Sequence, residues 1–177
     1  MDQKKVLKPE DIRNESFKAF QMFNDDWALA TSGTIDDYNT CTIGWGSLGD
    51  VWGPPSKGRS IVTIYINPNR YTNEYIMKND YFTVSFFKPE YKKDLAYLGS
   101  HSGRDEDKVS HTNLTAEAIE HGVDFEQAYL TFVCKKIYYH QFELENMIDI
   151  SDISEQLYTR LPPHYEYIGE IVKVIQK

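Results

Sequence analysis

The sequence predicts a mainly β fold, a small antiparallel barrel with helical decoration. Short runs rich in β-branched and aromatic residues, separated by turn signals, outnumber the helical segments. Their order is not a regular alternation of strand and helix, which argues against a doubly wound parallel sheet. The length of 177 residues, without a repeat or a dividing linker, predicts a single domain over residues 1–177.

The first 25 residues are expected to form an N-terminal extension. The segment from Asn14 to Asp25 predicts a short helix, in which Phe17, Phe20 and Met22 make a rough apolar stripe. The charged residues before it contain no apolar stretch that could serve as a signal peptide.

Six strands are expected after this extension, bounded by turn signals such as Ser32-Gly33 and Lys88-Pro89. The predicted strands are Trp27–Thr31, Thr40–Trp45, Ile61–Ile66, Tyr81–Phe87, Tyr129–Tyr139 and Tyr167–Ile175. The strand Ile61–Ile66 is apolar on both alternating faces. Such a strand suits a closed barrel that is also covered outside, by helices or by a second subunit.

Two helices are expected between the strands. Thr72 is positioned to cap the first, with Glu74 in its first turn complementing the helix dipole. Pro89 suits the first position of the second helix, which Gly99 is expected to terminate. Leu95 and Leu98, three residues apart, should share the buried face of this second helix.

Charge and cysteine content narrow the class of protein. The 19 Lys and Arg against 27 Asp and Glu give a formal charge of −8, so nucleic-acid binding is not expected. Any anionic ligand needs a local cluster of cations. Cys41 and Cys134 form no disulfide or zinc pattern. No apolar run is long enough to span a membrane, and a reducing, cytoplasmic compartment is expected.

The sequence contains no nucleophilic triad and no histidine pair with metal-ligand spacing. Its five histidines are scattered, and the acidic run 105–107 reads as an exposed loop rather than a glycosidase pair. Hydrolysis is therefore not supported, and no metal site is predicted.

Three segments nevertheless suit ligand binding, each with a plain structural alternative. In Asn39–Ser47, hydroxyls on one strand face and two glycines would let a flat ring approach the backbone; the alternative is a bulged edge strand. In Asn67–Thr72, Arg70 at a helix start suits a phosphate; the alternative is a solvated arginine. In Gly99–Lys108, serines and two cations suit an anion, unless the acids between them occupy the cations.

The strings TCTIGWGSLGDVWG, NPNRYTNEYI, NDYFTVSFF and YLGSHSGRDEDK, in this order and spacing, resemble the flavin reductase-like family of FMN-binding split barrels. The resemblance covers roughly residues 26–139 and extends through the final strand to Glu170. One departure is visible, because the family usually has Met where Cys41 stands.

The resemblance implies a six-stranded split barrel that forms a homodimer, with FMN bound near the subunit interface. It places Thr40, Cys41, Thr42 and Ile43 along the isoalloxazine and ribityl chain, Arg70, Tyr71 and Thr72 at the phosphate end, and Ser100, Ser102, Arg104 and Lys108 around the rest of the pocket.

The function implied is hydride transfer from NAD(P)H to FMN, for which the cofactors carry the chemistry and the protein positions the rings. The absence of an acid–base constellation from the sequence agrees with this function. Two alternatives remain: a non-catalytic FMN-binding electron carrier or redox sensor, and a barrel without cofactor that acts through protein contacts. Cys41 is not expected to be a catalytic thiol, because no cation lies near it in the sequence.

Overall fold

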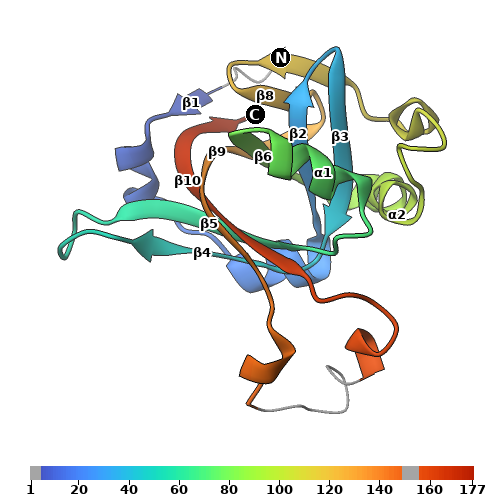
Figure 1. The fold of residues 1–177 in the computed structure, drawn as a ribbon. Coiled ribbons are helices and arrows are strands. Elements are labelled where there is room, and N and C mark those ends of the chain that lie inside the picture. Colours follow the sequence, from blue (N-terminus) through green and yellow to red (C-terminus); the bar gives the residue numbers. More distant parts are fainter. Residues whose placement is uncertain (1–4, 149–155) are drawn as a thin grey trace.

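The computed structural model describes residues 5–148 and 156–177 and shows one large antiparallel sheet curled into a barrel (Figure 1). The strand order is β3-β2-β6-β9-β10-β5-β4, with β1 added beside β10. The strands are β1 (Lys5–Leu7), β2 (Ala28–Thr34), β3 (Asp37–Ile43), β4 (Gly46–Val51), β5 (Arg59–Ile66), β6 (Tyr81–Phe87), β9 (Ala128–Gln141) and β10 (Tyr165–Gln176). The predicted mainly β barrel is confirmed, with eight strands in the described sheet where six were expected.

The barrel is split between β3 and β4. These strands stand at opposite ends of the strand order, yet only Gly44 and Trp45 separate them in the chain. So short a connection brings the two sheet edges together at this point. In the described sheet β3 pairs only with β2 and β4 only with β5, so the two edges meet without a hydrogen-bonded ladder.

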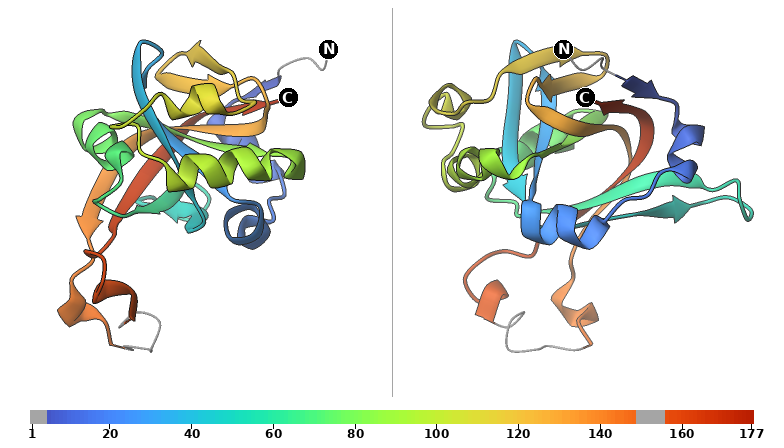
Figure 2. Two further views of the ribbon diagram at one scale, coloured as in Figure 1. Left: turned by 90° about the vertical axis from the view of Figure 1, so that its right-hand side faces the viewer. Right: turned by 180° about the vertical axis from the view of Figure 1, so that it is seen from behind.

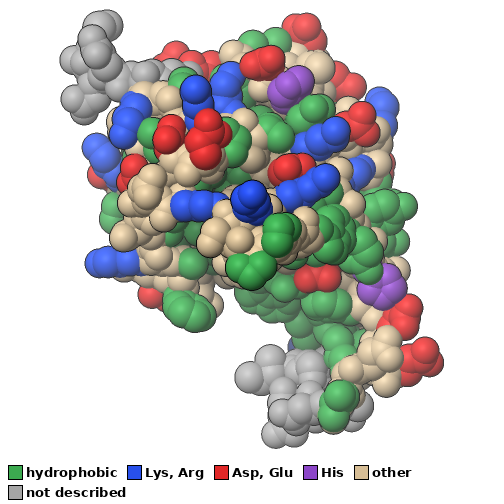
Figure 3. Space-filling model, turned by 90° about the vertical axis from the view of Figure 1, so that its left-hand side faces the viewer, with side chains coloured by type: hydrophobic (Ala, Val, Ile, Leu, Met, Phe, Trp, Pro, Cys, Tyr) green, Lys and Arg blue, Asp and Glu red, His purple; other side chains and the backbone are tan. Residues whose placement is uncertain are grey.

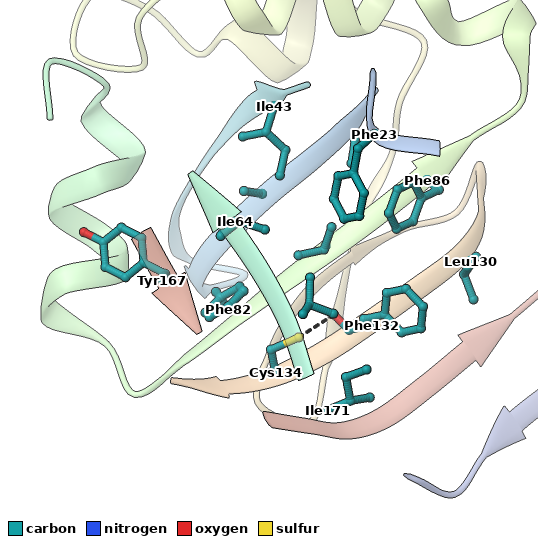
Figure 4. Packing of buried hydrophobic residues seen from close by; sticks show 14 of the residues in the cluster. Phe23, Ile43, Ile64, Phe82, Phe86, Leu130, Phe132, Cys134, Tyr167 and Ile171 are labelled. Carbon is teal, nitrogen blue, oxygen red and sulfur yellow. Dashed lines mark hydrogen bonds between the residues drawn. The ribbon is translucent and has the colours of Figure 1, made fainter. Parts of the chain in front are cut away.

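Large apolar side chains from several strands fill the barrel (Figure 4). Phe82 and Phe86 of β6 pack there with Phe132 of β9 and Ile64 of β5, all fully buried or nearly so. Burying one such side chain contributes about 1.5–3 kcal/mol relative to leaving it exposed. Tyr167 of β10 closes the same cluster, and its hydroxyl donates to Asn73 Oδ1 at 2.7 Å.

The outer face of β5 is also buried, as its pattern predicts. Ile61 and Thr63 on this face are only 6% and 5% exposed within a single chain. The chain itself therefore supplies the cover, and a second subunit is not needed to explain this pattern.

A second apolar cluster lies outside the barrel, where α2 (Lys92–Ser100) packs on β2 and β3. Leu95 and Leu98 of α2 are buried there, as predicted. The remaining elements are α1 (Tyr71–Lys78), the hairpin β7 (Ala116–Ile119) and β8 (Gly122–Phe125), and the short turns η3 (Pro89–Tyr91), η4 (Lys108–His111) and η5 (Leu144–Asn146). Figure 2 shows α1, α2 and the β7–β8 hairpin around the barrel from two further sides.

The predicted end of α2 is wrong. The helix continues through Gly99 to Ser100, and His101 caps it. Gly99 serves packing instead, because a Cβ at this position would lie 3.1 Å from Thr42 Cβ on β3. Pro89 opens the separate turn η3 directly before α2.

The N-terminal segment also differs from the single predicted helix. Two separate turns are present, η1 (Pro9–Asn14) and the π-helical η2 (Gln21–Asp26). Phe20 is 94% exposed, while Phe23, which the predicted stripe omitted, is buried in the barrel core. Residues 1–4 of the predicted extension lie outside the described residues. Within the described ranges, no helix combines the length and apolar character needed to cross a membrane.

Candidate functional site

A cavity of about 310 Å³ opens at the split of the barrel. It lies where the end of β3, the end of β5 and the segment before β10 come together. Its lining residues are Cys41, Thr42, Ile43, Gly44, Trp45, Tyr65, Ile66, Asn67, Asn69, Arg70, Leu161 and His164. The volume is at the lower end of the range for small-molecule sites. The fold thus brings four of the sequence-predicted residues, Cys41, Thr42, Ile43 and Arg70, to one cavity.

The unpaired edge of β3 forms one wall of this cavity. Because β3 has a partner on one side only, alternate backbone N–H and C=O groups face the split. The two predicted hydroxyls point elsewhere: Thr40 Oγ1 lies 2.8 Å from Thr31 Oγ1, and Thr42 Oγ1 donates to the Leu95 carbonyl at 2.5 Å. The backbone of β3, more than these hydroxyls, is therefore the polar surface that a ligand would meet.

Cys41 sits at the base of this wall and is 2% exposed. Burial raises the pKa of its thiol, and this effect outweighs a hydrogen bond with Thr72 and the nearby charges of Lys108 and Arg70. No cation lies near Cys41 in the sequence, but the fold brings Lys108 and Arg70 close to it. The expected consequence, a protonated thiol, is the same.

Arg70 stands at the cavity edge as the N-cap residue of α1. Its guanidinium donates to the Gly99 carbonyl at the end of α2. The prediction that Thr72 caps α1 is wrong: its buried hydroxyl donates to Asn39 Oδ1 at 2.7 Å. No side chain caps α1, so its first-turn N–H groups and Arg70 together form a positive corner.

Arg104 reaches this corner from the loop after α2. Its Nη1 donates to the Asn69 carbonyl at 3.3 Å, its guanidinium lies 4.6 Å from the centre of the Tyr71 ring, and its Nη2 pairs with Glu74. The loop is closed locally, because Ser102 Oγ accepts the Arg104 backbone N–H at 3.2 Å.

The other predicted residues of this loop have structural partners. Ser100 Oγ donates to the Ala96 carbonyl at 2.9 Å. Lys108 is buried, and its Nζ donates to the carbonyls of Leu98 at 2.9 Å and His101 at 3.1 Å. Burial lowers the pKa of Lys108. The Lys108 side chain therefore stabilises the C-terminal end of α2 and does not face the cavity at the split.

The opposite wall comes from a segment that the sequence reasoning missed. His164 lies 4.7 Å from Trp45, ring centre to ring centre, and its Nδ1 is 3.2 Å from the Tyr158 hydroxyl. Burial and the Arg70 charge lower the pKa of His164, so the ring is neutral at pH 7.

Hydrogen bonds on both sides hold this segment in place. Asn67 Nδ2 donates to the Pro162 carbonyl at 3.0 Å, and Gln141 Nε2 donates to the Pro163 carbonyl at 2.9 Å. Two consecutive prolines also reduce its conformational freedom. The stiff Leu-Pro-Pro-His string before the last strand is the sequence signal that could have drawn attention to His164.

A second hollow of about 720 Å³ lies beside Arg104. It includes the predicted residues Thr40, Arg104 and Lys108, but five carboxylates line it: Asp36, Asp37, Asp105, Glu106 and Asp107. Although it is larger, this charge makes it a poor site for an anionic ligand. In the part of the chain that the structure describes, no group of three or more His, Cys, Asp or Glu could hold a metal ion.

No family model and no curated protein sequence matches this chain. Solved structures do match its fold. An FMN-binding domain of a flavin reductase-like enzyme from Shewanella baltica aligns with 98% of this chain and 77% of its own, at 15% identity and a TM-score of 0.66. Flavoredoxin from Methanosarcina acetivorans aligns with 86% of this chain and 68% of its own, at 20% identity and a TM-score of 0.62.

The NADH:FAD oxidoreductase of Streptomyces globisporus aligns with 86% of this chain and 74% of its own, at 13% identity and a TM-score of 0.59. At such identities the likeness concerns the fold. The cavity at the split therefore belongs to a chain with the fold of the flavin reductase-like, FMN-binding split barrels.

Proposed function

We propose that this chain binds FMN in the cavity at the barrel split and transfers hydride from NAD(P)H to the flavin. One observation supports this proposal above all: the free edge of β3 and the positive corner at the start of α1 border the same cavity. The edge of β3 suits the polar rim of a flat heterocycle, and Arg70 at the uncapped start of α1 suits a phosphate. Both occur in a fold shared with FMN-binding proteins.

The residues present fit this cofactor. Trp45, Ile66 and Leu161 provide apolar surface for a ring, while the backbone from Cys41 to Gly44 provides hydrogen-bonding groups. The guanidinium of Arg104 meets the Asn69 carbonyl immediately before Arg70, which brings a second cation toward the phosphate end. An acidic protein needs such a local concentration of positive charge to hold an anion.

When bound, FMN would supply the site with a ring that accepts hydride from a reduced nicotinamide. The protein's share is positioning. The fixed Pro162–His164 segment brings His164 to the cavity that β3 and Trp45 also line. Tyr158 engages Nδ1 of His164 and so helps to fix a ring that lines the cavity.

An FMN-binding electron carrier or redox sensor is the second candidate. The structural match to flavoredoxin supports this candidate. The sequence also shows no constellation of residues for acid–base catalysis. Anaerobic addition of NADH or NADPH distinguishes the two: a reductase bleaches rapidly and then turns over many times in air, whereas a carrier does not. A purified protein without yellow cofactor, unable to take up FMN, would favour the third alternative, a barrel acting through protein contacts.

The phosphate assignment is tested by comparing FMN with riboflavin, which has the same ring and ribityl chain but no phosphate. Arg70→Ala and Arg104→Ala should each weaken FMN binding roughly tenfold to a hundredfold, because each removes a charge-assisted hydrogen bond of about 1.5–3 kcal/mol. Riboflavin binding should stay nearly unchanged, and added salt should weaken FMN binding mainly to the wild type.

Arg13→Ala is the matched control, because this exposed arginine pairs with Asp50 at 2.6 Å away from the cavity lining. It should alter neither flavin. If the Arg70 and Arg104 variants lose riboflavin and FMN equally, the arginines are structural. The anion site must then be sought at Lys57 or Arg59, because Lys108, the third cation considered, is buried against the end of α2.

We also infer a homodimer and a cytoplasmic location, the latter supported by two buried, unpaired cysteines.

A further inference from the structure

Arg104 already has an anionic partner within the chain. Its Nη2 pairs with the Glu74 carboxylate, and the two side chains are 41% and 58% exposed. Glu74 belongs to α1, whereas Arg104 lies in the loop after α2, so the pair links two separate elements next to the proposed phosphate end.

Glu74 is not needed to hold Arg104 in place. The guanidinium lies over the Tyr71 ring at 4.6 Å, and its Nη1 donates to the Asn69 carbonyl at 3.3 Å. An exposed ion pair adds little to such positioning, because water screens it. Removing the carboxylate should therefore leave the guanidinium near its present location.

The charge of Glu74 acts on the phosphate end in two ways. It neutralises Arg104, and it lies in the first turn of α1, where a carboxylate offsets the positive end of the helix. Both effects reduce the attraction that this corner exerts on a phosphate. Arg70, the other cation of this corner, donates to the neutral Gly99 carbonyl and keeps its charge.

We propose that Glu74 is a competing anion, which occupies Arg104 when the phosphate site is empty and is displaced when FMN binds. This inference rests on the proposed function and deepens it. Glu74 then sets the affinity for the phosphate and favours an exchangeable flavin over a permanently held one. The exposed carboxylate can turn toward water once the phosphate takes its place, since its described partner is Arg104 alone.

The test is the Glu74→Gln variant, which keeps the shape of the side chain and removes its charge. FMN and riboflavin are titrated separately by quenching of flavin fluorescence. We expect FMN to bind about two- to fivefold more tightly than to wild type, because the phosphate no longer has to displace the exposed Glu74–Arg104 ion pair. Riboflavin affinity should change less than twofold.

Glu170→Gln is the matched control, because Glu170 also pairs with one exposed arginine, Arg59, at 3.3 Å, at the far end of β5. It should affect neither flavin. In an Arg104→Ala background, Glu74→Gln should lose most of its effect, since the carboxylate then has no guanidinium to compete for. Thermal unfolding of each variant checks that the fold is intact.

Weaker or unchanged FMN binding to Glu74→Gln would overturn this inference and assign Glu74 a supporting or neutral role. An undiminished gain in the Arg104→Ala background would also overturn it, as a general field effect. A wild type that binds FMN and riboflavin equally would contradict the phosphate site itself. In that outcome the proposed phosphate site is wrong, and the inference that Glu74 competes with the phosphate for Arg104 is wrong as well.

Discussion

Cys41 illustrates how the environment decides the chemistry of one side chain. The thiol is next to the proposed ring position and has Arg70 and Lys108 near it, an arrangement that lowers the pKa of exposed cysteines. Burial in the barrel nevertheless dominates and raises the pKa. A thiol that stays protonated is a poor nucleophile, so its location beside a cofactor site does not make it catalytic.

We therefore expect Cys41→Ser to keep NADH- or NADPH-dependent turnover within about tenfold of wild type, with at most a shift of the flavin spectrum. Steady-state rates and the absorption spectrum of the reconstituted protein measure both. A loss beyond roughly a hundredfold in kcat with FMN still bound would show that the thiol takes part in the reaction. Cys134→Ser tests the other buried thiol, which lies in the core and outside the lining of the cavity.

Single residues were predictable where local sequence carries the signal. Arg70 stands directly before a helix start, so its position could be inferred from neighbours in the chain. Trp45 and His164 could not be paired in this way, because 118 intervening residues separate them and only the barrel brings their rings together. The Arg104–Glu74 ion pair could not be predicted either, because the two residues are distant in the sequence. The local acids around Arg104 were expected to compete for it, and a residue of another helix does so instead.

Among the elements, apolar patterns in the sequence predicted the central strands, whereas glycines prevented the prediction of the edge strand β4. The sequence predicts β6 with its observed ends and finds β5, β9 and β10 within two residues at each end. Strand β4 was missed because Gly46 and Gly49 interrupt the β-branched pattern. Gly46 is required there by packing, since a Cβ would lie 2.3 Å from the Phe23 ring.

Gly169 tests the same principle in the middle of β10, where the pairing with β9 shifts register. A Cβ here would lie 2.5 Å from Phe82 Cζ and 2.6 Å from Cys134 Cβ, both fully buried. Gly169→Ala should cost about 1–3 kcal/mol of unfolding free energy through overpacking, or roughly 2–4 °C in Tm per kcal/mol. Differential scanning calorimetry measures the shift.

Gly49→Ala is the matched control, because nothing lies within 4 Å of a Cβ added at this strand position. It should leave Tm unchanged or raise it slightly by reducing the entropy of the unfolded chain. Equal losses in both variants would mean that backbone entropy or strand propensity, rather than contact with Phe82, explains the effect.

One face of the molecule is divided between charged and apolar side chains (Figure 3). Charged residues of both signs are interspersed over the upper part of the face in Figure 3, and hydrophobic side chains gather toward its lower part. Trp45 and Leu161 at the cavity, with Tyr138 and Tyr139 near the end of β9, are large apolar side chains that remain 36–48% exposed. Trp45 and Leu161 lie at the cavity, and exposed apolar side chains of this kind suit an interaction surface.

The burial of β5 within one chain removes the original argument for a homodimer, and this exposed group replaces it. A second copy covering Trp45, Leu161 and Tyr138 would also shield the open side of the cavity at the split from water. We expect light scattering at micromolar concentration to give twice the mass of one chain. Tyr138→Glu should shift the protein toward monomer and weaken FMN binding together, because a charge in an apolar interface must be desolvated.

The control for dimerisation is Val6→Glu. Val6 is an exposed apolar residue on β1, which pairs with the opposite end of β10 from the cavity. This variant should remain dimeric and bind FMN as wild type does. A monomeric wild type with FMN bound would refute the dimer. If Tyr138→Glu becomes monomeric with unchanged FMN affinity, the site is complete within one chain, and the partner surface serves assembly alone.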